Sequence, residues 1–148
     1  MHVLDVLTIL FVGLMIGNEL AVSLFVNPVM WQLDNRSQTQ ALNLLARVLG
    51  KAMPAWYAAC LLLILMEAYV HRHEQGLALI LAAAAIWIVV ILLTVMFLVP
   101  INNRVAAMTP EVFVASGKME HKKWDTMHRW RVVALTIAMV CLLEGILR

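Results

Sequence analysis

Four runs of apolar residues follow one another along the chain, and polar stretches separate them. The runs cover residues 3–26, 52–70, 77–99 and 132–143. A helix rises 1.5 Å per residue, so about 20 apolar residues cross a hydrocarbon core of roughly 30 Å. The last run is short, but its helix is expected to begin in the membrane interface near Trp124. The pattern predicts an all-α fold, a bundle of four transmembrane helices, in one domain comprising residues 1–148.

An amphipathic stretch over residues 31–51 joins the first two helices. Pro28 disfavours helical geometry at the preceding residue and is expected to end or kink the first helix. The tetrapeptide from Ser37 to Gln40 resembles a capping box, and an apolar stripe follows it as far as Gly50. We expect a short amphipathic helix here, lying against the membrane or the bundle.

A second amphipathic connection, over residues 101–123, joins the third and fourth helices. Pro100 is expected to close the third helix. Thr109 marks a helix start and Gly117 a helix stop, which predicts another short helix between them. The link between the second and third helices, residues 71–76, is a tight polar turn.

The composition indicates an integral membrane protein. Hydrophobic residues make up 64% of the chain and charged residues 14%, whereas soluble domains are nearer half and a quarter. The sequence contains neither a Gly-rich phosphate loop nor a basic array with interleaved aromatics, so it gives no support for nucleotide or nucleic-acid binding. Cys60 and Cys141 lie inside apolar runs and are expected to be buried without a disulfide. The first run is longer than a signal-peptide core and no Lys or Arg precedes it, which favours a retained helix.

Basic residues are distributed unevenly between the two sides of the predicted bundle. Nine of the eleven lie in or beside the first and third connections, and the other two are Arg72 and Arg148. Basic residues accumulate in cytoplasmic loops. Both long connections are therefore expected in the cytoplasm and both termini outside.

Glu19 is the most informative polar residue within the apolar runs. Glu19, Ser23 and Asn27 step by four and share one helix face. A charged side chain at the bilayer centre costs at least about 2.5 kcal/mol, so Glu19 should face the bundle and find a partner. A reactive or proton-carrying carboxylate and a paired structural carboxylate both fit this position.

A second polar stripe precedes the last apolar run. His121, Trp124, His128 and Arg131 recur at steps of three, four and three, which places them on one helix face. The predicted topology brings this stripe to the same membrane level as Glu19. Imidazole transfers protons or binds metals, and arginine fixes an anionic oxygen. An interfacial anchor of Trp and cationic side chains is the structural alternative.

Asn102 and Asn103 follow Pro100 and either cap the third helix or hydrogen-bond a ligand, and Asn27 has the same two interpretations. Contact with water is expected for the remaining polar candidates, His71, His73, His121, Glu67 and Glu144.

Two motifs in the C-terminal half resemble those of small four-helix membrane proteins related to fungal anthrone oxygenases. The family pattern Pro-x-Asn-x-x-(Leu/Val) matches residues 100–105, PINNRV, and Trp-x-x-(Leu/Met)-His-x-x-Arg matches residues 124–131, WDTMHRWR. In topology the resemblance extends over nearly the whole chain. The specific residues occupy about a quarter of it.

The resemblance implies an oxygenase-like protein, because characterised relatives add oxygen to an anthrone, a polycyclic phenol, and give an anthraquinone. Glu19 or His128 would act as the base that forms the enolate, and Arg131 or an Asn would stabilise the oxyanion. The substrate-binding candidates are Asn27, Asn102, Asn103 and Trp124. Such a reaction has no obligatory cofactor. Glu19 and His128 could ligate a metal ion, although two ligands do not define a site.

The expected partners are the lipid bilayer and a hydrophobic aromatic, phenolic or quinone-like molecule, with no nucleic acid; a homo-oligomer is left open. The expected location is a bacterial inner membrane. Two alternatives remain at this point, a small proton-coupled transporter of hydrophobic compounds that uses Glu19 and a structural subunit of a membrane complex. Small transporters have shorter loops, however, and lack the entrance formed by His128 and Arg131.

Overall fold

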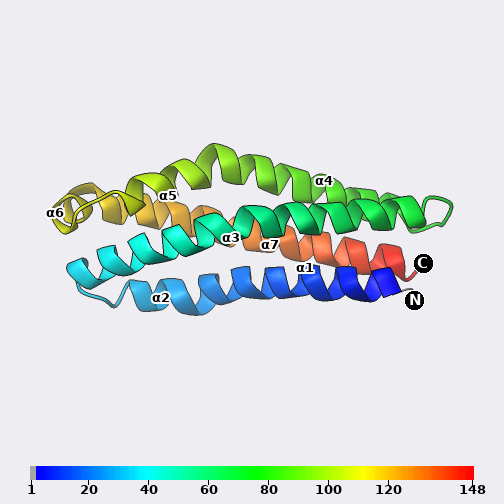
Figure 1. Cartoon of the computed structure of the whole chain (residues 1–148), viewed down its shortest axis with the longest axis horizontal. Helices are drawn as coiled ribbons and strands as arrows, with labels where there is room; N and C mark the ends of the chain where they lie inside the picture. Colours follow the sequence, from blue (N-terminus) through cyan, green and yellow to red (C-terminus); the bar gives the residue numbers. More distant parts are fainter. Residues whose placement is uncertain (1–2) are drawn as a thin grey trace.

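Four long helices lie side by side as an elongated bundle in the computed structural model, which describes residues 3–148 (Figure 1). The first consists of α1 (Val3–Ala21), the π-helical turn η1 (Val22–Val26) and α2 (Asn27–Met30). The second is α3 (Asn35–Val70). The third consists of α4 (Leu77–Leu93), η2 (Thr94–Leu98) and α5 (Val99–Ala106). The last consists of α6 (Pro110–Val112), η3 (Phe113–Gly117) and α7 (Lys118–Ile146).

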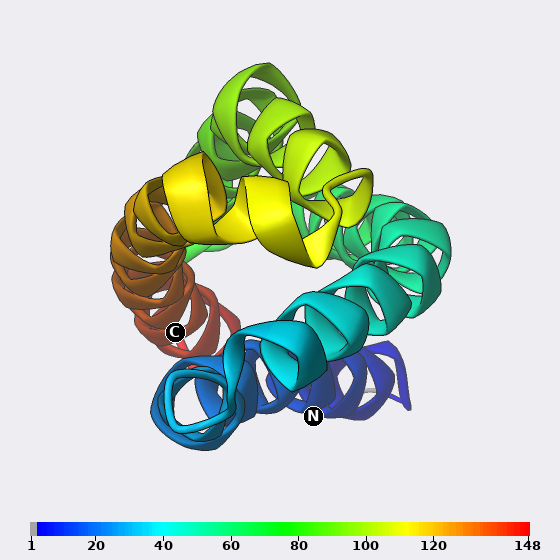
Figure 2. The same ribbon diagram turned by 90° about the vertical axis from the view of Figure 1, so that its left-hand side faces the viewer.

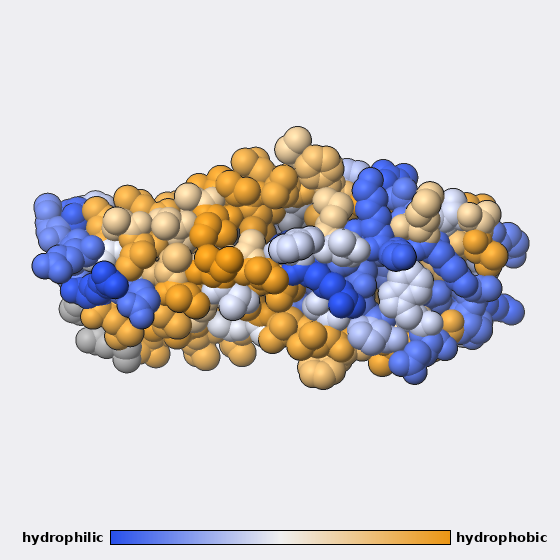
Figure 3. Space-filling model, turned by 180° about the vertical axis from the view of Figure 1, so that it is seen from behind, coloured by the Kyte–Doolittle hydropathy of each residue, from blue (hydrophilic) through white to orange (hydrophobic). Residues whose placement is uncertain are grey.

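Three of these helices are long and apolar enough to cross a membrane, namely Val3–Met30, Asn35–Val70 and Leu77–Ala106. Large apolar side chains cover their outer surfaces, among them Leu10, Phe25, Leu92 and Met96. Figure 3 shows a hydrophobic belt between hydrophilic ends. The protein is therefore an all-α integral membrane protein, which confirms the class that the composition predicted.

The apolar core lies between the four long helices. Met15 of α1, Ile64 of α3 and Leu135 of α7 are buried in it, together with residues of α4. Helices α4 and α7 come into close contact where Gly76, the N-cap of α4, faces Gly145, because a Cβ added to Gly76 would lie 1.8 Å from the Gly145 carbonyl oxygen. Hydrogen in place of a side chain at both positions allows this contact.

The two prolines expected to end or kink helices lie inside continuous helices instead. Pro28 is in α2 and Pro100 is in α5, and a π-helical turn directly precedes each of them. A proline ring clashes with the carbonyl four residues earlier. In the wider π turn, Asn27 donates to Val22, five residues earlier, which gives the ring room. Both helices therefore continue toward the connections.

The separate amphipathic helix predicted between residues 31 and 51 is wrong, because this stretch is the first half of α3. The helix begins earlier than the Ser37 capping box suggested. Asp34 is its N-cap, and the Asp34 carboxylate accepts hydrogen bonds from the backbone N–H groups of Arg36 and Ser37. An internal glycine costs a helix only about 1 kcal/mol, so α3 continues through Gly50. In Figure 2 this cyan half of α3 runs obliquely across the end of the bundle.

Gly117 does not stop a helix as predicted, because its φ of −65° is helical and the chain continues directly into α7. The aromatic ring of Phe113 packs against it, since a Cβ at Gly117 would lie 2.4 Å from the Phe113 ring. Phe113 belongs to a small second core with Ile101 and Val105. The predicted short helix before α7 is thus joined to it.

Candidate functional site

A cavity of about 330 Å³ lies among α1–α2, the first half of α3, the η2–α5 region and the start of α7. Its wall is mainly apolar, with Leu45, Leu49, Met53 and Leu98 among the lining residues. All seven residues proposed for the site from the sequence line it, namely Glu19, Asn27, Asn102, Asn103, Trp124, His128 and Arg131. The structure thus brings them together, while their roles in binding and catalysis remain predictions.

Glu19 is 2% exposed, and its carboxylate is paired with a guanidinium. Arg131 Nη2 lies 2.6 Å from Glu19 Oε2 and 2.8 Å from His128 Nδ1, so it donates to both. Arg131 Nη1 lies 3.4 Å from Thr94 Oγ1. The expectation that Glu19 faces the bundle and has a partner there is confirmed.

The hydrogen bonds of His128 define its tautomer. Nε2 lies 3.1 Å from the backbone carbonyl of Glu19, which can only accept, so Nε2 carries the proton. Nδ1 then holds the lone pair that receives Arg131. Trp124 stacks on the imidazole, with ring centres 4.8 Å apart and planes within 8°. The neutral ring is fixed by its neighbours and orients Arg131.

His121 is buried, so the expectation that it contacts water is wrong. Its ring stacks on Trp31, with centres 4.5 Å apart, and its Nδ1 lies 3.5 Å from Gln38 Nε2. Both partners come from α3 or the turn before it. The amphipathic stretch covers His121 because it continues as α3 over the start of α7.

Asn27 uses its side-chain amide within the protein. Asn27 Nδ2 donates to Asp125 Oδ1 at 2.7 Å, and Arg129 lies 3.3 Å from the other Asp125 oxygen. Asp125 is a site residue that was not predicted from the sequence, although it follows His121 by four residues and lies on the same helix face. Its carboxylate fixes the amide of Asn27 at the cavity wall.

Tyr57 is a further cavity residue that the sequence analysis missed. It is 6% exposed, lines the cavity, and its ring centre lies 5.7 Å from Arg131 Cζ. It stands at the start of an apolar run, a position that is typical of aromatic residues in the membrane interface. Leu45, Leu49, Met53 and Tyr57 form one stripe at steps of four, but this signal depends on α3 continuing through Gly50.

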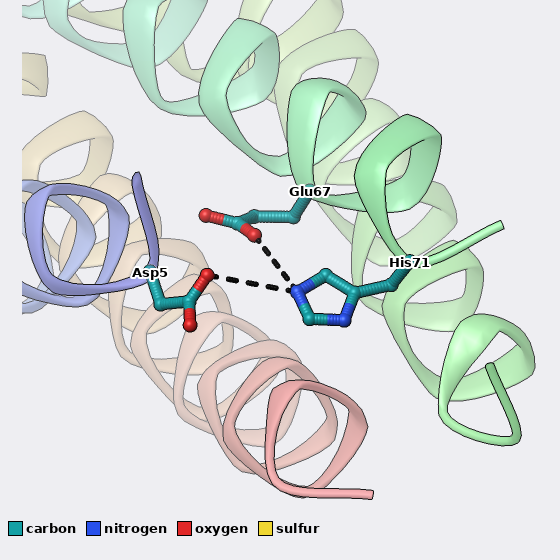
Figure 4. A group of neighbouring side chains, drawn as sticks. All are labelled: Asp5, Glu67 and His71. Atoms are coloured by element: carbon teal, nitrogen blue, oxygen red, sulfur yellow. Dashed lines mark ion pairs between the residues drawn. The ribbon is translucent and has the colours of Figure 1, made fainter. Parts of the chain in front are cut away.

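A second buried polar cluster lies at the opposite end of the bundle, beside the N-terminal end of α1. Glu67 and His71 are 0% and 3% exposed, so the expectation that they reach water is wrong. Asp5 lies beside them (Figure 4). Thr8 Oγ1 donates to Glu67 Oε1 at 2.6 Å. A hydrogen bond from His71 Nδ1 to the Glu74 carboxylate raises the pKa of His71.

Three other side chains, those of His73, Glu144 and Cys60, lie as the sequence predicted, whereas Cys141 is half-buried rather than buried. His73 is exposed, and so is Glu144, which pairs with Arg148 at 3.6 Å. Cys60 is buried, and neither it nor the half-buried Cys141 forms a disulfide.

The fold and the site define a helical integral membrane protein in which a largely apolar cavity is bordered by a Glu–Arg–His cluster. A family model described as anthrone oxygenase matches residues 42–141, and the chain belongs to this family. The match includes His128 and Arg131 but begins after Glu19. No curated protein and no solved structure matches the chain.

Proposed function

We propose that the protein oxidises a hydrophobic phenol or quinone-like molecule, which binds in the cavity beside Glu19 and Arg131. The family supports oxygenase-like chemistry. The cavity volume of about 330 Å³ lies at the lower end of the range of roughly 300–1,000 Å³ for ligand pockets. Its apolar wall suits a fused-ring molecule and its polar groups gather at one place.

The observation that carries the proposal is a pair of unused donors at this cavity. Tyr57 Oη and Arg131 Nε are buried, and neither has a hydrogen-bond partner among the described residues. An unsatisfied buried donor costs about 1–3 kcal/mol. A phenolate or enolate oxygen bound between Tyr57 and Arg131 would accept from both, and such donors stabilise the oxyanion as it forms.

Glu19 is the proposed proton acceptor. The two nitrogens of His128 are engaged with the Glu19 carbonyl and with Arg131, so a carboxylate oxygen is the base that a bound molecule can reach. Loss of a proton from the substrate's activated methylene carbon gives a carbanion. Oxygen oxidises this carbanion, is itself reduced as a C–O bond forms, and loss of water leaves a ketone.

The position between Glu19 and His128 suits a guanidinium better than a metal ion. The Arg131 nitrogen within 2.8 Å of both side chains occupies the place that a bridging cation would take. We therefore propose that Glu19, His128 and Arg131 act without a metal between them.

The proposed arrangement in the membrane has four spans with both long connections in the cytoplasm. Helix α7 packs along α4 and α1, which belong to two of the three apolar helices, and this supports a fourth crossing. The uneven distribution of Lys and Arg supports this orientation. The cavity would then lie toward the cytoplasmic side.

Oxygen consumption in nanodiscs, with anthrone as the probe, tests the proposal. Glu19→Gln should lower turnover by about 10²–10⁴, the usual contribution of general acid–base catalysis. Arg131→Lys should also be damaging, because an ammonium cannot reproduce a planar fork of donors. The exposed Glu144→Gln is the matched control and should retain wild-type turnover.

Two results would contradict the proposal. Equal turnover in Glu19→Gln and wild type would remove Glu19 from the mechanism. Absence of oxygen uptake, together with proton-coupled flux in liposomes that Glu19→Gln abolishes, would identify a transporter. Circular dichroism of each variant shows whether a loss reflects chemistry or unfolding.

A further inference from the structure

Two buried carboxylates converge on one buried imidazole at the end of the bundle remote from the cavity. Asp5 comes from α1, Glu67 from the last turn of α3, and His71 is the residue that caps α3. They are 1%, 0% and 3% exposed. Figure 4 shows both carboxylates directed toward the same ring nitrogen of His71.

The spacing of these atoms matches a metal coordination shell. His71 Nε2 lies 3.6 Å from Asp5 Oδ1 and 3.4 Å from Glu67 Oε2, and one ligand atom from each residue lies within 4.8 Å of the others. These separations exceed the 2.7–3.2 Å typical of hydrogen bonds. Ligands about 2.1 Å from a zinc ion in tetrahedral geometry stand roughly 3.4 Å apart.

Neighbouring side chains orient two of these groups toward the shared point. Thr8 binds Glu67 Oε1, and Glu74 binds His71 Nδ1. Glu67 Oε2 and His71 Nε2 remain, buried and without a hydrogen-bond partner among residues 3–148. A carboxylate that holds the outer nitrogen of a metal-binding histidine is a recurrent arrangement in metal sites.

We propose that Asp5, Glu67 and His71 bind a divalent transition-metal ion such as Zn²⁺. Two carboxylate oxygens and one imidazole nitrogen are ligands that such ions accept, and a dication balances the two carboxylates. Three protein ligands leave at least one position for water. The ion would link α1 to the end of α3, and this site is independent of the proposed oxygenase cavity.

Metal content measures this directly. Detergent-solubilised protein is stripped with EDTA, incubated with Zn²⁺ or with Co²⁺ as a spectroscopic probe, and analysed by mass spectrometry and visible absorption. About one ion per chain is expected, together with the d–d bands of protein-bound Co²⁺. His71→Ala should remove binding, while His73→Ala, whose imidazole is exposed two residues away, should bind like wild type.

Two carboxylate variants and one carboxylate control sharpen the test. Glu67→Gln should weaken Zn²⁺ binding by about 100-fold or more, while Glu144→Gln should leave it unchanged. Glu74→Gln should weaken binding by about 10–100-fold, as is usual for groups that orient a ligand; its carboxylate is 47% exposed, so this variant tests the site even if Glu67→Gln does not fold. Two results would overturn the proposal: wild-type protein that binds no stoichiometric metal, or unchanged Zn²⁺ affinity in His71→Ala. Either result would indicate that His71 is protonated and pairs with both carboxylates instead.

Discussion

Tyr57 offers the sharpest test at the scale of single residues, because its hydroxyl has no partner among the described residues. Tyr57→Phe removes only this oxygen. This substitution should lower turnover with anthrone by about 10–100-fold, a smaller loss than the roughly 10²–10³-fold measured when an oxyanion-hole donor is removed from other enzymes. The thermal midpoint should change little, because Tyr57 Oη makes no hydrogen bond of ordinary geometry and interacts only with the nearby Glu19 carboxylate. A lowered midpoint with normal turnover would indicate a structural hydroxyl instead.

Single polar residues could be predicted from the sequence where local spacing alone decides their direction. Glu19 and Asn27 lie on one helix face, and so do His128 and Arg131, whatever the rest of the chain does. Glu67 could not be predicted in this way. Its burial depends on Thr8, which lies 59 residues away in sequence, and membrane-level rules place such a residue at the interface.

Asp34 is decisive for where α3 begins. Its carboxylate accepts hydrogen bonds at the helix start, first from the Ser37 side chain and then from the backbone N–H of Ser37, and these hold its pKa below the ordinary value. Asp34→Ala should therefore lower the thermal midpoint at neutral pH, whereas Asp34→Asn, which keeps an acceptor, should change it little.

The advantage of Asp34 over alanine should depend on pH in one direction. A lowered pKa in the folded protein means that the carboxylate stabilises it fully above the ordinary aspartate pKa. That stabilisation is lost as the pH falls through the lowered pKa. Melting curves of wild type and Asp34→Ala should thus converge in acid; a difference that stays constant with pH would contradict the cap.

The close approach of α4 and α7 also belongs to the scale of elements. Gly76→Ala would place a Cβ 1.8 Å from the Gly145 carbonyl oxygen, so the helices must separate. Overpacking of this kind costs about 1–3 kcal/mol, and the thermal midpoint should fall clearly. Gly17→Ala is the matched control, because nothing lies within 4 Å of its added Cβ. Equal midpoints for the two variants would show that the contact is looser.

Helix boundaries were the least predictable part of the fold. The apolar runs identified the long helices, but Pro28, Gly50, Pro100 and Gly117 were all interpreted as helix ends. Pro28 and Pro100 each follow a π turn that leaves room for the proline ring, and the Phe113 ring packs against Gly117. Such compensations arise from tertiary packing and from one extra residue in a turn, neither of which a hydrophobic pattern records.

At the scale of the whole molecule, both termini lie at one end of the bundle, beside the turn after α3, and α6 lies at the other (Figure 1). Ser116 and His73 are exposed near these opposite ends. In the proposed orientation, Ser116→Cys should react with a membrane-impermeant maleimide only from the cytoplasmic side. His73→Cys should react only from the outside. The reverse labelling pattern would show that the protein has the opposite orientation. Labelling of both cysteines from the same side would contradict the single membrane crossing proposed between residues 73 and 116.

The length of α3 has a consequence for how such an enzyme would meet its substrate. Its 36 residues extend about 54 Å, well beyond a hydrocarbon core of roughly 30 Å. In the proposed arrangement, the first half, which lines the cavity, would reach from the acyl chains into the headgroup layer. A hydrophobic phenol dissolved in that leaflet would exchange between the lipid and the cavity without passing through bulk water. Its apparent KM should follow the mole fraction of phenol in the lipid: doubling the nanodisc lipid at constant total phenol should halve the rate below saturation.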